Sequence, residues 1–134
     1  MDLEKLQTLV LLRNKITSLS NDSFAGLQLL KNLDLEGNQL QTLEESTLSH
    51  LIGLRYLDAE WNQLKELSPS LFSNNRLLRF LSFSYNPIEN ISPDLLRNLK
   101  YLQELRMRGL NLSSVDHIHH TKLTHLCLDD NVIQ

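Results

Sequence analysis

The sequence contains one cysteine, Cys127, so no disulfide can form within the chain. Glycine and proline are also scarce, with 4 and 3 residues among 134, and no linker-like run divides the chain. No segment approaches the roughly 20 apolar residues that a membrane-spanning helix needs. The chain has the length of one ordinary domain, and no linker or membrane-spanning segment divides it. We therefore expect residues 1–134 to form a single domain.

An excess of positive charge is missing as well. The chain has 13 lysine and arginine residues against 16 aspartate and glutamate residues, which gives a formal net charge of -3. Nucleic-acid-binding proteins usually carry a clear basic excess, so the balance argues against a nucleic-acid partner. With 41% hydrophobic and 22% charged residues, the composition is that of a folded chain and not of a disordered one.

The sequence contains six copies of one motif, leucine-x-x-leucine-x-leucine-x-x-asparagine-x-leucine, in which other apolar residues can replace leucine. Each copy is called a phrase below. Successive phrases begin 24, 24, 24, 24 and 21 residues apart. Their opening leucines are Leu6, Leu30, Leu54, Leu78, Leu102 and Leu123. Their asparagines are Asn14, Asn38, Asn62, Asn86 and Asn131, and the fifth phrase has Leu110 in that place. Apolar residues also recur in the second half of each repeat, where Asn75 alone departs from the pattern. A fixed period of this length indicates a solenoid of stacked repeats.

The physical chemistry of the phrase predicts the fold. Residues around its second and third leucines alternate inward and outward as in a short strand, and one repeat cannot bury its leucines alone. Stacked repeats can pair their strands and share one core, with each asparagine turned inward to satisfy backbone groups. Because the strands pack closer together than the opposite segments, the stack curves. We therefore expect an α/β solenoid, right-handed and curved, of about six repeats. Its parallel sheet should form the concave face, and its convex side should be irregular or short-helical.

The phrase from Leu78 to Ile88 and the segment from Leu67 to Phe72 resemble the 24-residue "typical" class of extracellular leucine-rich repeats. That class includes the ectodomains of Toll and Toll-like receptors, Slit, chaoptin and insect immune leucine-rich proteins. The resemblance covers essentially the whole chain. It implies a non-catalytic recognition module that binds a protein ligand or co-receptor through its concave face. The setting it implies is an animal receptor or a secreted immune, developmental or adhesion protein, outside the cell or at its surface.

One alternative to this interpretation stays open. The repeats could form a structural or scaffolding segment, inside the cell, without a dedicated ligand. The chain also lacks the cysteine-rich caps that such proteins usually carry, and Met1 to Lys5 resembles the tail of an earlier repeat. We therefore expect a fragment of a longer ectodomain, whose uncapped ends are able to self-associate.

Outward positions of the phrases predict the residues of the concave face. Equal spacing places Tyr56 beside Phe80, and Trp61 beside Tyr85. An acidic block lies on one side of these pairs and a basic block on the other. The candidate ligand-binding residues are Tyr56, Asp58, Glu60, Trp61, Phe80, Tyr85, Asp34, Glu36, Arg106 and Arg108. Aromatic anchors flanked by charge are typical of binding hot spots, although aromatic residues on a solenoid can also pack on each other without a ligand.

Three N-glycosylation sequons begin at Asn21, Asn90 and Asn111, which mildly favours secretion. Asn21 and Asn90 fall on the flank beyond the strands. Asn111 directly follows Leu110. In a second interpretation the chain shifts by one residue here, and the Asn111 side chain points inward in place of the missing phrase asparagine. Asn111 would then be inaccessible to glycosylation.

No catalytic site, metal or cofactor is expected. His117, His119 and His120 cluster in the shortened repeat with His125 nearby, but a solvated loop explains them better than a zinc site. The residue types of a hydrolase triad occur together at Ser113, Ser114, Asp116 and His117. A triad is defined by its geometry and an oxyanion hole and not by proximity in sequence, so we do not expect one here. The chain has no glycine-rich phosphate loop and no paired carboxylates with an evident catalytic role. Cys127 takes an outward strand position, where we expect a partly shielded side chain.

Overall fold

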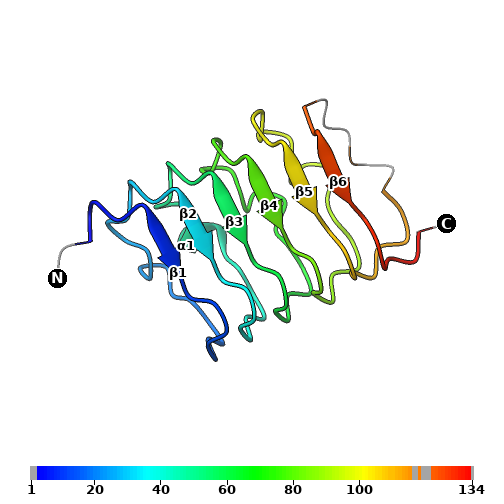
Figure 1. The fold of residues 1–134 in the computed structure, drawn as a ribbon, viewed down its shortest axis with the longest axis horizontal. Coiled ribbons are helices and arrows are strands. Elements are labelled where there is room, and N and C mark those ends of the chain that lie inside the picture. The colour runs from blue at the N-terminus through cyan, green and yellow to red at the C-terminus, as the bar shows by residue number, and fades with distance from the viewer. Residues whose placement is uncertain (1–2, 116–117, 119–121, 134) are drawn as a thin grey trace.

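The computed structural model describes residues 3–115, 118 and 122–133, and these form one sheet of six short parallel strands (Figure 1). The strands are β1 (Thr8–Val10), β2 (Asn32–Asp34), β3 (Tyr56–Asp58), β4 (Phe80–Ser82), β5 (Glu104–Arg106) and β6 (His125–Cys127). They follow one another across the sheet in sequence order, so the two ends of the chain lie at opposite ends of the stack (Figure 1).

Each strand pairs with its neighbour in the register that the repeat dictates. Leu33 of β2 lies opposite Leu57 of β3, and Leu81 of β4 lies opposite Leu105 of β5. Every side chain on the sheet therefore stands beside its own equivalent in the next repeat. This arrangement confirms the predicted solenoid, with its parallel sheet on the concave face.

The core is a stack of leucines from all but the outermost repeats. Leu33, Leu57, Leu81 and Leu105 are all fully buried. Burying a leucine side chain contributes on the order of 2 kcal/mol, and each repeat supplies several. In the last described repeat the equivalent Leu126 is 42% exposed.

The convex side is made of turns and one short helix, α1 (Glu45–Leu48), among the residues described. This agrees with the expected irregular or short-helical segments. Phe72 is buried there and meets Phe83 at a ring-centroid distance of 5.8 Å. Asn75, which departs from the apolar pattern, is fully buried and donates to the carbonyl oxygens of Leu48 and Leu51.

Four of the five phrase asparagines form the predicted inward ladder, and Asn14 of the first repeat is exposed. The Oδ1 of Asn62 accepts the Leu40 backbone N–H at 3.0 Å, and its Nδ2 donates to the carbonyls of Leu35 and Ala59. Asn38, Asn86 and Asn131 make the same three kinds of bond. Each asparagine therefore ties its own repeat to the preceding one at the point where the chain leaves the strand.

The ladder is interrupted in the fifth repeat. Leu110 is buried and 2% exposed, and Asn111 is exposed to solvent. The chain keeps its register there, so the interpretation in which Asn111 slips into the inward role is wrong. Leucine fills the inward position by packing and supplies no hydrogen bond.

No helix among the described residues combines the length and the apolar character needed to cross a bilayer.

Candidate protein-binding surface

The concave face is organised in rows, because each strand lies in register with the next. Tyr56 pairs with Phe80, and Asp58 pairs with Ser82. Two residues beyond each strand end, the rows continue with Glu60 and its equivalents. The predicted concave residues are therefore brought together on one surface, in the order that their spacing indicates.

Two aromatic pairs border this surface, as predicted. The rings of Tyr56 and Phe80 are stacked with centroids 4.3 Å apart and an interplanar angle of 9°. The rings of Trp61 and Tyr85 are stacked at 4.2 Å, also with an angle of 9°. Trp61 remains 55% exposed. Tyr56, Phe80 and Tyr85 are half-buried, so each stacked pair presents a partly exposed aromatic surface.

Trp61 and Tyr85 occupy a backbone position that ordinarily favours glycine. Trp61 has a φ of 56° and Tyr85 a φ of 61°, within the left-handed region. All six equivalent positions share this conformation: Arg13, Gly37, Trp61, Tyr85, Gly109 and Asp130. For a residue with a side chain, the left-handed conformation costs roughly 1 kcal/mol. Because glycine occupies this position in two repeats, the fold requires the left-handed backbone conformation but does not require the aromatic rings of Trp61 and Tyr85.

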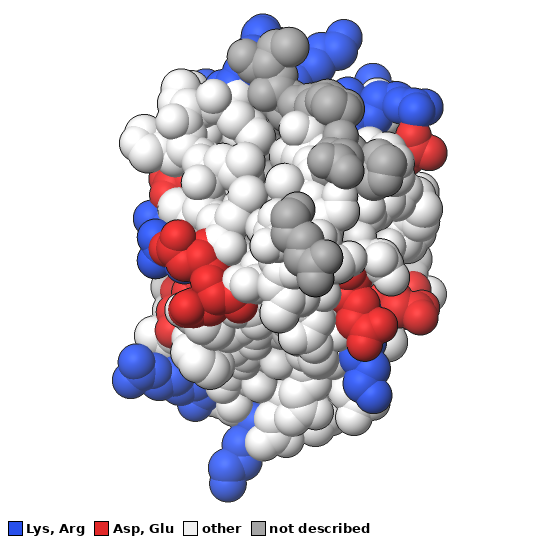
Figure 2. All heavy atoms as spheres, turned by 90° about the vertical axis from the view of Figure 1, so that its right-hand side faces the viewer, with Lys and Arg blue, Asp and Glu red and all other residues white. Residues whose placement is uncertain are grey.

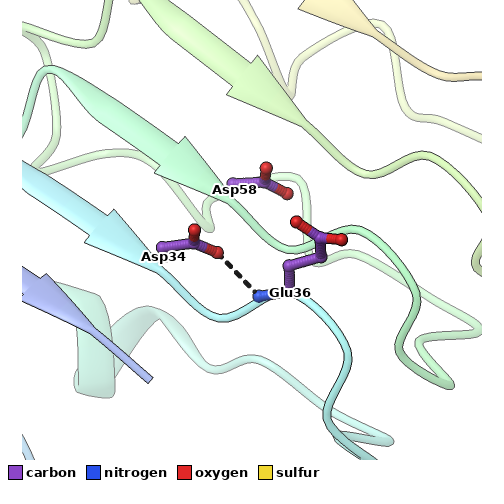
Figure 3. Close-up of side chains that lie close together, drawn as sticks. All are labelled: Asp34, Glu36 and Asp58. Carbon is purple, nitrogen blue, oxygen red and sulfur yellow. Dashed lines mark hydrogen bonds between the residues drawn. The ribbon is translucent and has the colours of Figure 1, made fainter. Parts of the chain in front are cut away.

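Three of the four predicted acidic residues gather on one part of the sheet, and the fourth, Glu60, acts on Asp58 from two residues further along the chain. One carboxylate oxygen each from Asp34, Glu36 and Asp58 lies within 4.8 Å of the others (Figure 3). Oδ1 of Asp34 accepts the Glu36 backbone N–H at 3.0 Å, and Oδ1 of Asp58 accepts that of Glu60 at 2.9 Å. Each aspartate therefore fixes the turn that follows its own strand.

Asp58 departs from the expectation of an exposed carboxylate, since it is only 7% exposed. Burial raises the pKa of Asp58 to about 7, and repulsion by Glu60, Asp34 and Glu36 adds to the rise. The Glu60 N–H acts in the opposite direction. A proton on Asp58 therefore exchanges near neutral pH, which changes the charge of this surface.

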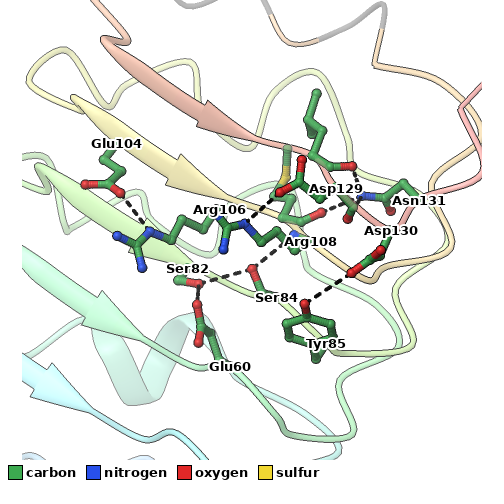
Figure 4. A network of polar contacts seen from close by, with 12 residues as sticks. Glu60, Ser82, Ser84, Tyr85, Glu104, Arg106, Arg108, Asp129, Asp130 and Asn131 are labelled. Atoms are coloured by element: carbon green, nitrogen blue, oxygen red, sulfur yellow. Dashed lines mark hydrogen bonds and ion pairs between the residues drawn. The ribbon is translucent and has the colours of Figure 1, made fainter.

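Two serines, Ser82 and Ser84, lie in the middle of the concave face, and charged side chains of adjacent repeats lie next to them (Figure 4). Ser82 and Ser84 are fully buried, although their strand positions predicted exposure. The Ser82 hydroxyl donates to Glu60 at 2.6 Å, and the Ser84 hydroxyl accepts the Arg108 backbone N–H at 3.0 Å. Long side chains from adjacent repeats thus lean over small ones, which position in the sequence cannot reveal.

The predicted basic block is present but is balanced by its own neighbours (Figure 4). Arg106 pairs with Glu104 at 2.7 Å, and its guanidinium lies 5.0 Å from the centre of the Phe80 ring. Arg108 lies 3.4 Å from Asp129. The Glu104 hydrogen bond raises the pKa of Arg106 above its ordinary value.

The sequon asparagines Asn21, Asn90 and Asn111 are all exposed. Asn90 and Asn111 line the same open depression on the flank, of about 650 Å³. Cys127 is half-buried as expected. His117, His119 and His120, together with Asp116, lie outside the described residues.

The end of the stack beyond β6 is largely uncharged where it is described, with acidic and basic side chains around its rim (Figure 2). Leu126, Val132 and Ile133 are exposed in this last repeat.

A leucine-rich repeat family model matches residues 4–64, and a second leucine-rich repeat model matches residues 77–99. Among solved structures, the leucine-rich repeat domain of APL1B superposes with a TM-score of 0.90 at 25% identity, over 97% of this chain and 40% of that one. TLR13, in its complex with ssRNA13, gives a TM-score of 0.81 at 29% identity over 93% of this chain and 19% of its own. A leucine-rich repeat protein of Leptospira interrogans gives 0.84 at 28% identity, over 96% and 32%.

No curated protein sequence matches the chain significantly. The chain spans well under half of each of these three solved structures, between 19% and 40%. The two matched ranges contain β1 to β4, whose register repeats with the 24-residue spacing. The chain is a solenoid of leucine-rich repeats, a fold that typically serves protein–protein interaction.

Proposed function

We propose that this chain is a non-catalytic recognition module and that its concave face binds a protein partner. The single observation that carries the proposal is Trp61. Its indole is 55% exposed, is stacked on Tyr85, and stands on a left-handed backbone position that glycine occupies in two other repeats. A costly aromatic side chain that the fold does not need points to selection for contact with something outside the chain.

The charge of the face supports a protein partner over a nucleic acid. Asp34, Glu36, Asp58 and Glu60 lie beside the aromatic pairs, and phosphate groups would be repelled by them. TLR13 was solved with ssRNA13, but for this chain we infer a protein ligand or co-receptor. We further propose an extracellular or cell-surface setting, in an animal receptor or a secreted immune or developmental protein, with Asn21, Asn90 and Asn111 as glycosylation sites.

Selection from a displayed library of small protein domains tests the proposal without a known partner. Binders selected against the whole chain should lose most of their affinity for a Trp61→Ala/Tyr85→Ala variant, by at least about tenfold. A matched control is Leu77→Ala/Tyr101→Ala, which removes exposed apolar area from residues that precede β4 and β5.

Three outcomes would count against the concave face. The selection could yield no binder, or binders could ignore the aromatic variant, or they could depend only on Leu77 and Tyr101. The last two results would favour a flank of the solenoid as the working surface. Circular dichroism and thermal unfolding of each variant separate lost contact from lost fold.

A further inference from the structure

The two charged blocks of the concave face differ in one respect that the sequence does not show. Arg106 and Arg108 each pair with an acidic side chain. No ion pair among the described residues involves Asp34, Glu36 or Asp58. The acidic group over β2 and β3 is therefore without an ion-pair partner, unlike the basic block.

Asp58 is the member of this group with the greatest need of a partner. Its side chain is more than nine-tenths buried, and its Oδ1 accepts one backbone N–H, that of Glu60. No group in the described part of the chain donates to its Oδ2. Burial, reinforced by the nearby carboxylates, raises the pKa of Asp58 to about 7. A buried carboxylate without a counter-charge is stabilised when one arrives from outside.

A hollow of about 260 Å³ lies beside these carboxylates, over β1, β2 and β3. It is lined by Thr8, Leu9, Val10, Asn32, Asp34 and Tyr56. Phe80 stacks on the Tyr56 ring from β4, and the hollow lies on the β2 side of that ring. Val10 is 57% exposed. The hollow thus combines an apolar wall and an aromatic wall with the carboxylate of Asp34, and the carboxylates of Glu36 and Asp58 lie beside Asp34.

We propose that this acidic hollow, lined by Val10, Asp34 and Tyr56 with the carboxylates of Glu36 and Asp58 beside that of Asp34, receives an arginine side chain of the protein partner. The aliphatic part of an arginine fits against Val10, and its guanidinium stacks on Tyr56. The planar fork of the guanidinium can donate to Asp34 and Asp58 together, as a single ammonium point charge does not. The inference rests on the proposed protein-binding function and names the chemistry of the partner's anchoring residue.

A titration with a defined peptide tests the proposal directly. The probe is a capped peptide with one arginine between two leucines, flanked by glycine and serine. Its control is the same peptide with citrulline, which keeps the shape of arginine and removes its charge. In amide spectra of the whole nitrogen-15-labelled chain, the arginine peptide should shift β2 and β3 resonances. The citrulline peptide should bind about tenfold more weakly.

Variants of the chain add a second arm. Asp34→Asn/Glu36→Gln keeps the side-chain shapes and should weaken the arginine peptide about tenfold. Glu66→Gln/Glu89→Gln removes the same charge from the flank depression and should leave binding unchanged. Thermal unfolding verifies that both variants fold. Equal binding of the two peptides, shifts located elsewhere, or no shift by about 10 mM peptide would overturn the proposal.

The domain selection separates this inference from the proposed function. Binders that require Trp61 and Tyr85, but carry no basic residue at the interface and ignore Asp34→Asn/Glu36→Gln, would overturn the arginine site and leave the binding function intact. Binders that ignore Trp61 and Tyr85 altogether would overturn the proposed function itself.

Discussion

The ring of Tyr85 lies so close over Gly109 that a Cβ added at residue 109 would stand 2.3 Å from Cδ1 of the tyrosine. The glycine in the fifth repeat and the tyrosine in the fourth are therefore one structural unit. The Tyr85 hydroxyl extends further, to Asp130 of the sixth repeat, at 3.3 Å. The aromatic stack with Trp61 is thus supported from below by residues of two later repeats.

Gly109→Ala should destabilise the protein by about 2–4 kcal/mol, because the methyl group displaces the Tyr85 ring and the φ of 60° is left-handed. Gly26→Ala is the matched control, since Gly26 has a φ of 83° with nothing within 4 Å of its added Cβ. It should cost only about 1 kcal/mol. Urea unfolding measures both. Equal losses would show that the ring contact contributes nothing.

Trp61 and Tyr85 should be energetically coupled in the folded chain itself. In a double-mutant cycle with Trp61→Ala and Tyr85→Ala, the interaction free energy should be about 0.5–1.5 kcal/mol, which is usual for a stacked pair. Trp61→Gly should be more stable than Trp61→Ala, because glycine relieves the left-handed strain. A cycle that sums to zero would mean that the two rings merely lie near each other.

Asn62→Ala should cost about 2–4 kcal/mol of unfolding free energy, because it leaves the buried Leu40 N–H and two carbonyls without their side-chain partner. Asn14→Ala should cost less than about 1 kcal/mol, since Asn14 is exposed and bonds only carbonyls within its own repeat. Chemical denaturation of the two variants tests the difference. Comparable losses would contradict the role assigned to the buried ladder.

Asp58 should make stability depend on pH. The folded-state pKa of Asp58 is about 7, whereas the carboxyl in the unfolded chain titrates near about 4. Between these values the folded protein keeps a proton that the unfolded chain has released. The free energy of unfolding therefore falls as pH rises from about 4 to about 7, and this contribution is constant above that range.

Asp58→Asn removes this titration and can still accept the Glu60 N–H. The variant should be more stable than the wild type at about pH 8, with a flatter profile between pH 5 and 8. Asp22→Asn, at an exposed position, is the control for loss of one charge. The measurement is the urea midpoint of unfolding of the wild type and both variants across this pH range. Parallel wild-type and Asp58→Asn profiles would show that Asp58 ionises normally.

The sequence predicts most of this fold because the fold is itself periodic. A spacing of 24 residues fixes the strand register, and the register alone places Tyr56 beside Phe80 and Trp61 beside Tyr85. The left-handed position also leaves a signal in the sequence. Gly37 and Gly109 stand at the places equivalent to Trp61 and Tyr85, a signal that the sequence-based predictions did not use, and the φ angles of the structure identify the strain.

Other features depend on side-chain direction and cannot be read from spacing. Asp58 and Ser82 take outward strand positions but are buried, because Glu60 and its neighbours lean over them. The neutralisation of Arg106 by Glu104 likewise follows from rotamers. The distinction between a balanced basic block and an unbalanced acidic one required the structure.

Trp61 is the only tryptophan in the sequence, so its fluorescence reports on the concave face alone. The most direct test of the central claim is acrylamide quenching of Trp61 during titration with a selected binder that lacks tryptophan. If the partner covers the concave face, quenching should fall and the emission should shift to shorter wavelength in proportion to occupancy. If binding saturates while quenching and emission stay those of the free chain, the partner binds elsewhere and the account is wrong.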